Sequence, residues 1–226
     1  EFGYALNAKV AGQPLPGDWN VRQSIALLYE TQDPSPNQSG DPDEALEALP
    51  EGSEGLLVAF ADHNVTQIPP DMSVEAVVQS WQMYETCQRR LSLLLRGLIE
   101  YARAHDGKLP EADSWCDDIA PYIEQTHMGP EIFACPGAVD LECGYAINAD
   151  LAGKDIRQLR NHSQYVVLLP AEEGVRNESL KLPEKVEMGR HMPRWGFGSR
   201  LGVNVGLLNG SMAEIAEGQP YPRPPQ

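Results

Sequence analysis

The clearest pattern along the chain is a stripe of apolar residues with helical spacing in its middle. Between residues 73 and 106, apolar side chains recur at intervals of three, four or seven. They are Val74, Val77, Val78, Trp81, Tyr84, Leu91, Leu94, Leu95, Leu98, Tyr101 and Ala102. Ser73 can cap the first turn, and Asp106-Gly107 with Pro110 beyond it is a typical helix end. The spacing predicts one amphipathic helix of about 32 residues, roughly 48 Å long.

Short apolar runs typical of strands lie on both sides of this helix, and they recur in pairs. Residues 3–12 and residues 144–153 are identical at seven of ten positions, including Gly-Tyr-Ala-x-Asn-Ala. Each copy continues with an apolar run, at residues 24–30 and 165–169, and then with a predicted hairpin, at residues 55–68 and 202–215. Asn209-Gly210 suits the positive φ angles of a tight hairpin turn. Three matched segments in the same order indicate an internal repeat of a sheet unit.

These patterns divide the chain into three parts and predict an α+β fold, a long amphipathic helix packed on antiparallel sheets. Residues 1–70 form the first sheet unit, a copy without a helix of its own in this sequence. Residues 71–217 hold the long helix, a short helix near Asp113–Ile123 and the second sheet unit. Residues 218–226, with four prolines, form a tail. The acidic stretch Asp33–Glu54, rich in Pro, Ser and Gly, is predicted to be a long solvated loop.

Composition and charge exclude several classes of protein. The chain has 226 residues, of which 42% are apolar and 22% charged, as expected of a globular protein. A net charge of −16 argues against nucleic acid as a partner and against an anionic membrane surface. No run approaches the ~18 apolar residues of a membrane span. Because Gly3-Tyr4-Ala5 has the pattern of a strand inside a domain, we expect the sequence to be trimmed from a longer parent protein.

Four cysteines, Cys87, Cys116, Cys135 and Cys143, permit two disulfides with three possible connectivities. Cys135 and Cys143 flank a short stretch with a proline and a glycine, and they are candidates for a local pair. Buried thiols are the alternative. A zinc site is disfavoured, because no Cys-x-x-Cys occurs and the five histidines are scattered. Disulfides would indicate an oxidising, extracytoplasmic compartment.

No catalytic motif is found, and we expect a protein that is not an enzyme. Gly52-Ser53-Glu54-Gly55 lacks the glycine two positions before the serine that a nucleophile elbow requires. His63, next to Asp62, falls on a predicted turn, and His191 falls in a predicted loop. No cofactor is expected. The dense acids of residues 33–54, and Asp117-Asp118, raise the question of a structural calcium ion, but no calcium-loop motif is present.

Four aromatic residues are candidate contacts for a ligand or partner. Trp81 and Tyr84 lie on the helical stripe, which favours the core over a ligand platform. Trp195 and Phe197 lie in a glycine-rich segment. They are either core residues or exposed rings that stack on a sugar or contact a partner.

Several short motifs extend from the long helix into the second sheet unit. In chain order they are Cys87-Gln88-Arg89-Arg90-Leu91, Leu98-Ile99-Glu100-Tyr101-Ala102, His105-Asp106-Gly107-Lys108-Leu109-Pro110, Trp115, Pro121-Tyr122-Ile123, Phe133-x-Cys135-Pro136 and Gly144-Tyr145-Ala146-Ile147-Asn148. This order resembles that of bacterial type IV pilin-like and pseudopilin-like proteins. The group in question carries a C-terminal His-x9-Asp-Gly motif associated with prepilin processing.

The sequence departs from that closing motif in both copies. The first has Asp62-His63 in place of Asp-Gly, and Gly52 where the histidine would stand. The second has Asn209-Gly210 in place of Asp-Gly, and Ser199 at the histidine position. The resemblance therefore assigns no role to such a pair here.

The resemblance implies a non-enzymatic structural or assembly protein of the periplasm or cell surface. Its parent would be anchored in the membrane by a helix that this sequence does not contain. Its partners would be copies of itself or components of a pilus or type II secretion apparatus. Some pseudopilins carry a structural calcium ion, so the resemblance also admits calcium. The alternative is a secreted or surface binding module that recognises glycan or protein through its duplicated sheets.

Overall fold

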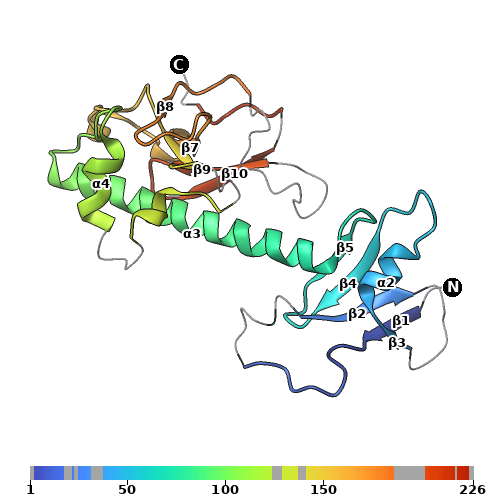
Figure 1. The fold of residues 1–226 in the computed structure, drawn as a ribbon. Helices are drawn as coiled ribbons and strands as arrows, with labels where there is room; N and C mark the ends of the chain where they lie inside the picture. The colour runs from blue at the N-terminus through green and yellow to red at the C-terminus, as the bar shows by residue number, and fades with distance from the viewer. Residues whose placement is uncertain are drawn as a thin grey trace. The chain divides into compact units, whose positions relative to one another are not determined.

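The structure is a computed structural model of the 226-residue chain. The residues it describes are 3–17, 22, 25–31, 38–123, 129–136, 141–185, 202–216 and 218–223. The chain divides into two compact units, Glu1–Gln82 and Met83–Gln226. Helix α3 (Val74–Ala104) gives its first residues to the first unit and the remainder to the second (Figure 1).

The described part of the first unit contains a five-stranded sheet, the short helix α2 and the start of α3. Its elements are β1 (Gly3–Asn7), β2 (Ala26–Thr31), β3 (Ser39–Gly40), α2 (Pro42–Glu47), β4 (Leu56–Phe60) and β5 (Val65–Ile68). The strand order is β3-β1-β2-β4-β5, and only β1 and β3 run parallel.

The second unit holds a sheet of the same order. Its elements are the remainder of α3, α4 (Trp115–Ile123), β6 (Tyr145–Asn148), β7 (Val166–Pro170), β8 (Ser179–Leu180), β9 (Gly202–Leu207) and β10 (Met212–Ala216), with 3₁₀ turns η2 (Pro130–Phe133), η3 (Ile156–Gln158) and η4 (His162–Gln164). The strand order β8-β6-β7-β9-β10 repeats that of the first sheet. Strands β6 and β8 run parallel, as β1 and β3 do.

The α+β class, the long helix, the short helix and both hairpins are confirmed, but the expectation of antiparallel sheets is wrong. Each sheet is mixed, because a two-residue strand adds to its first strand in the parallel sense. A strand of two residues leaves no hydrophobic alternation in the sequence. For this reason the pattern could not have predicted either one.

The acidic stretch of residues 33–54 is not the long solvated loop that its composition suggested. Its described part contains β3 and α2, and Leu46 of α2 is buried. Asp41 caps α2 by accepting a hydrogen bond from the Asp43 N–H at 3.1 Å. Asp43 Oδ1 in turn accepts one from the Val74 N–H at 2.8 Å, at the start of α3. The carboxylates therefore satisfy the unpaired N–H groups of two helix starts.

The asparagine of the repeated Gly-Tyr-Ala-x-Asn segment makes the same bonds in both units. Asn7 donates from Nδ2 to the Ala26 carbonyl at 2.9 Å, and Asn148 donates to the Val166 carbonyl at 2.8 Å. Each Oδ1 accepts from the backbone N–H two residues later, at 3.0 Å. Both asparagines are buried. This residue thus closes the turn after the first strand and ties it to the second, which is a structural role.

The described residues of the first unit form one apolar core, whereas those of the second unit form two. In the first unit one face of the sheet is packed, by Ala5, Ala26, Tyr29, Leu46, Leu56, Val58, Phe60, Ile68, Val74, Val77 and Val78. In the second unit the matching face is packed by Ala146, Val166, Leu169, Val203, Val205, Leu207, Ile215 and Tyr221. A further core lies between the other face of the second sheet and α3, formed by Leu91, Leu94, Leu95, Leu98, Ala102, Trp115, Ile119, Ile147 and Leu168, among others. The second sheet is therefore covered on both faces.

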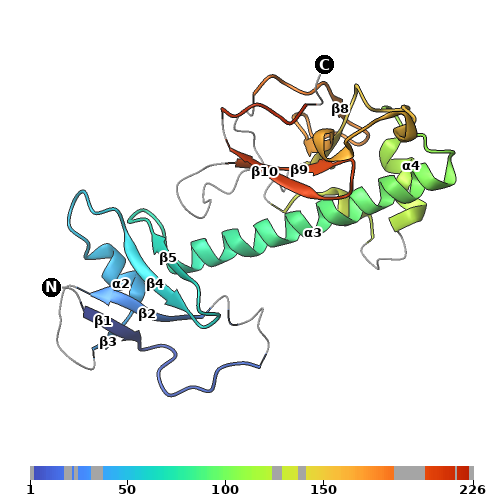
Figure 2. The same cartoon turned by 180° about the vertical axis from the view of Figure 1, so that it is seen from behind.

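Two glycines allow close packing around α3 in the second unit. A Cβ on Gly206 of β9 would lie 2.5 Å from Leu95 Cδ2, and one on Gly97 of α3 would lie 2.6 Å from Ile123 Cγ2 of α4. Figure 2, seen from behind, shows α3 along the β9–β10 side of this unit with α4 beside its C-terminal end. The helix therefore packs directly on the sheet and is itself overlaid by α4.

Candidate functional site

The two aromatic residues proposed as partner contacts, Trp195 and Phe197, lie outside the described residues, as do His191 and Ser199. Trp81 is half-buried in the first unit, where its ring lies 4.8 Å from that of Phe60 in an edge-to-face arrangement. The ring thus packs in the core, as the stripe predicted.

Tyr84 belongs to the second unit, where its hydroxyl donates a hydrogen bond to Glu214 Oε2 of β10 at 3.0 Å. Burial, and then the hydrogen bond to Glu214, raise the pKa of Tyr84. The bond attaches this part of α3 to the edge strand of the second sheet.

The histidine–aspartate pair of the first hairpin stabilises a turn. His63 is exposed, and its backbone φ is 71°. It occupies the same hairpin position as Gly210 of the second unit, whose φ is 85°. Asp62 is 5% exposed, and its Oδ1 accepts from the Asn64 N–H at 3.0 Å. The carboxylate is thus occupied with holding the turn, which agrees with the prediction of a turn residue.

No disulfide joins the four cysteines, all of which lie in the described residues. Their sulfurs approach in two pairs. Cys87 Sγ of α3 lies 2.9 Å from Cys135 Sγ, just after η2, and Cys116 Sγ of α4 lies 3.9 Å from Cys143 Sγ, just before β6. The structure thus brings together partners distant in sequence, whereas the sequence had suggested a local pair of Cys135 and Cys143.

The Cys116–Cys143 pair is fully buried. The hydrogen bond with Cys143, and then burial, raise the pKa of the Cys116 thiol. Cys143 donates to the Tyr145 carbonyl at 3.1 Å. The Cys116 thiol is therefore a poor nucleophile, since the thiolate is the reactive form. The same hydrogen bond between the two thiols acts in the opposite direction on Cys143 and lowers the pKa of that thiol.

The aspartates considered for calcium are engaged with the protein. Asp117 Oδ1 lies 2.7 Å from Arg176 Nη2, and Asp117 Oδ2 accepts from Asn177 Nδ2 at 2.7 Å. The bond from Asn177, and then that from Arg176, lower the pKa of Asp117. Within the described residues, no cluster of three or more His, Cys, Asp or Glu side chains could hold a metal ion.

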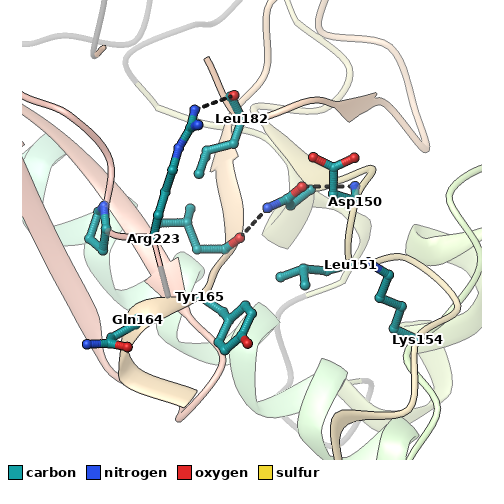
Figure 3. A pocket seen from close by; sticks show the side chains of 10 residues that line it. Asp150, Leu151, Lys154, Gln164, Tyr165, Leu182 and Arg223 are labelled. Atoms are coloured by element: carbon teal, nitrogen blue, oxygen red, sulfur yellow. Dashed lines mark hydrogen bonds between the residues drawn. The ribbon is translucent and has the colours of Figure 1, made fainter. Parts of the chain in front are cut away.

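The second unit has a pocket of about 290 Å³ at the turn after β6 (Figure 3). It is lined by Asn148, Asp150, Leu151, Lys154, Gln164, Tyr165, Val166, Leu182, Pro222 and Arg223. Its lining is apolar at Leu151, Val166 and Leu182, and it carries two cationic side chains and one carboxylate. The Arg223 guanidinium donates to the carbonyls of Leu182 and Pro183, at 3.3 and 3.0 Å.

The pocket offers polar groups of several kinds to a ligand. The described residues that line it include no histidine, cysteine, serine or threonine, and its ionisable side chains are those of Asp150, Lys154, Tyr165 and Arg223. Gln164 Oε1 is buried and has no hydrogen-bond partner among the described residues, which leaves an acceptor at the wall. Lys154 and Arg223 favour an acidic group on a ligand. Sequence reasoning missed this site, because its residues come from four separate segments that share no motif.

No family model matches the chain, and no curated protein and no solved structure is significantly similar to it. Among the described residues, no helix has both the length and the apolar character that crossing a membrane requires.

Proposed function

We propose that this chain is a non-enzymatic structural or assembly protein of the type IV pilin-like, pseudopilin-like class. It would act outside the cytoplasm, at the periplasm or cell surface, with its parent anchored in the membrane. Its partners are copies of itself or components of a pilus or secretion apparatus. Because the sequence departs from the His-x9-Asp-Gly motif, the proposal does not include a role in prepilin processing.

The observation that carries the proposal is the packing of α3 in the second unit. A long helix that comes before its sheet in the chain lays Leu91, Leu94, Leu95 and Leu98 on one sheet face. The sheet then closes with the β9–β10 hairpin. Helix first, then a sheet packed along it, is the order that the resemblance to pilin-like proteins implies. The short sequence motifs at Cys87–Leu91 and Gly144–Asn148 fall in the expected elements.

A duplicated sheet unit is part of the same proposal. It is supported by identical strand orders, by the parallel two-residue strands and by the matching bonds of Asn7 and Asn148. Both second strands also shift register at the same place, between Ala26 and Leu28 and between Val166 and Leu168. Such an irregularity is a specific feature rather than a general one. Its presence in both sheets favours a common origin.

Cross-linking in the cell that produces the protein tests the proposal. A short lysine-directed cross-linker is added to intact cells, and the products are separated by size and identified by mass spectrometry. A ladder of self-multiples, or links to secretion or pilus components, is expected. Cross-linking after lysis and dilution is the control for random encounters. A monomer linked only to one unrelated protein or to surface glycan would contradict the proposal.

The pocket beside β6 favours a second candidate, a secreted or surface binding module. Its volume is close to the lower limit for small-molecule sites, and its two cations would accept an acidic sugar or a peptide carboxylate. Titration with acidic sugars and short peptides, followed by NMR, tests it. Shifts confined to residues 148–166 that are lost in Lys154→Ala would support this candidate, and uniform or absent shifts would reject it. Trp195→Ala tests the aromatic contact in the same experiment.

A further inference from the structure

One face of the first sheet is apolar and exposed. Two rows of side chains cross it in register. One row is Leu6, Leu28, Ala59 and Val65, and the next is Tyr4, Glu30, Leu57 and Gln67. The apolar members are solvent-exposed by 67% at Tyr4, 61% at Val65, 41% at Leu28, and 38% at both Leu6 and Leu57. A contiguous patch of this kind on a sheet marks an interaction site, whereas scattered exposed apolar residues do not.

The same row in the second sheet is covered at its first three positions, whereas Met212 at its end is 37% exposed. Ile147, Leu168, Gly206 and Met212 occupy the register positions of Leu6, Leu28, Ala59 and Val65. Ile147 and Leu168 are fully buried, and Tyr145, the counterpart of Tyr4, is 5% exposed. The two faces thus have similar side chains, and they differ in exposure on the first two strands of each row, at Leu6 and Leu28 against Ile147 and Leu168.

Helix α3 provides the cover in the second unit. Leu95 lies against Gly206, at the distance that leaves no room for a Cβ. The Tyr145 hydroxyl donates to the Cys87 carbonyl of the helix at 3.1 Å. Leu91, Leu94, Leu95 and Leu98 share one core with Ile147 and Leu168. An amphipathic helix with leucines at positions i, i+3, i+4 and i+7 therefore fits this type of sheet face.

We propose that the open face of the first sheet, defined by Tyr4, Leu6, Leu28, Leu57 and Val65, binds an amphipathic helix of a partner polypeptide. The helix carries a stripe like that of Leu91, Leu94, Leu95 and Leu98. A Lys or Arg beside the stripe would meet Glu30, which lies in the second row, and would suit the net charge of −16. Ala59 carries a Cβ where Gly206 has none, so the bound helix would lie farther from β4 than α3 lies from β9. The inference rests on the comparison of the two sheets and does not depend on the pilin-like proposal.

A helix is favoured over a strand for a geometric reason. The exposed groups are side chains on the face of the sheet, and strand addition needs the backbone groups of an edge. The apolar residues of one row also cross four strands, which matches the long axis of a helix laid across a sheet.

The test is the titration of the 226-residue protein with a labelled peptide of residues 88–104, the leucine-bearing part of α3. Fluorescence anisotropy should show saturable binding. A peptide of the same composition in scrambled order, without the stripe, should not bind. Hydrogen exchange should show protection in β1, β2 and β4, whereas protection in β6, β7 and β9 would show that the peptide replaces α3 and would overturn the proposal.

Leu28→Asp should weaken peptide binding at least tenfold, because it puts a charge in the centre of the face. Val175→Asp is the matched control, an exposed apolar residue of the second unit, and should bind as the unmodified protein does. If Leu28→Asp fails to fold, Tyr4→Asp replaces it, since Tyr4 is the most exposed member.

Absence of saturable binding, or binding that is unchanged in both Leu28→Asp and Tyr4→Asp, would overturn the proposal. So would a concentration-dependent dimer that Leu28→Asp abolishes, since the face would then join two copies of this chain. Peptide binding and the cross-linking ladder are independent readouts, so either proposal can fail while the other stands.

Discussion

The two sheets share their strand order, their parallel edge strand and the bonds of their asparagines, yet one is covered on both faces and the other on one. In the first unit the residues of the open face are nonetheless apolar. Ala26-Leu27-Leu28-Tyr29 is a continuous apolar run, which is typical of a strand buried on both sides. A sheet face adapted to water would alternate with polar residues. The first sheet therefore has the apolar sequence of a sheet that is buried on both faces, although only one of its faces is buried.

The largest contrast is expected for the matched leucines of the second strand. Leu168→Ala should lower the free energy of unfolding by up to about 5 kcal/mol, because Leu168 is fully buried between sheet and helix. Leu28→Ala should cost less than about 1 kcal/mol, since Leu28 is 41% exposed. Urea unfolding of both variants measures the difference. Equal losses would refute the distinction between a covered and an open face.

Oxidation should act on the second unit alone, because all four cysteines belong to it. Disulfides Cys87–Cys135 and Cys116–Cys143 would close loops across 48 and 27 positions. Each should stabilise the second unit by about 3–4 kcal/mol if the geometry relaxes. Mild oxidation, peptide mapping and hydrogen exchange measure pairing and stability together. A Cys135–Cys143 bridge would instead favour the local pair suggested by the sequence, and stabilisation of β1 or β2 would contradict the assignment to one unit.

The two repeated asparagines should behave alike. Asn7→Ala and Asn148→Ala each remove one bond to a carbonyl and one from a backbone N–H, at a site that is buried. Each should cost about 2 kcal/mol, because buried partners are left unpaired. Thermal unfolding followed by exchange mass spectrometry assigns each loss to its unit. A loss in one variant only would show that the likeness of the two turns is superficial.

The smallest effect is expected in acid, where the turns that follow Gly12 and Gly153 differ. The hydrogen bond from Arg157 lowers the pKa of Asp155 to about 2, whereas Pro14 stands at the matched position of the first unit. Because the pKa of Asp155 in the folded protein lies below the ordinary value of 3.8, this stabilisation is present above that pH and is lost as the pH falls towards 2.

Melting temperatures of the unmodified protein and of Asp155→Asn, taken between pH 5 and pH 2, measure this effect. The difference between them should shrink with falling pH. A constant difference would show that the carboxylate acts through its shape and not through its charge.

The sequence predicts a helix or strand well where the hydrophobic pattern of that element is long. The stripe from Val74 to Ala102 is long, and the helix appears where it was expected. The hairpins follow from turn residues such as Asn209-Gly210. Strands β3 and β8 are too short to produce a pattern. Helix α2 was hidden by acidic composition, although Leu46 supplies its buried contact.

The candidate sites were less predictable, because their residues meet only in three dimensions. Cys87 and Cys135 are brought together by the fold of α3 against η2, which spacing alone cannot show. Lys154 and Arg223 of the pocket are 69 positions apart in the sequence. The open face could not be predicted for another reason. The sequence of an apolar sheet face is the same whether or not a helix covers that face.

Tyrosine modification tests the comparison of the two sheets most directly. Tyr4 and Tyr145 occupy the same place in their sheets, and they are 67% and 5% exposed. Treatment with tetranitromethane, followed by peptide mapping, should nitrate Tyr4 rapidly and leave Tyr145 unmodified, and the peptide of residues 88–104 should protect Tyr4. Equal reactivity of the two tyrosines, or a Tyr4 that the peptide leaves unprotected, would contradict an open face that accepts a helix.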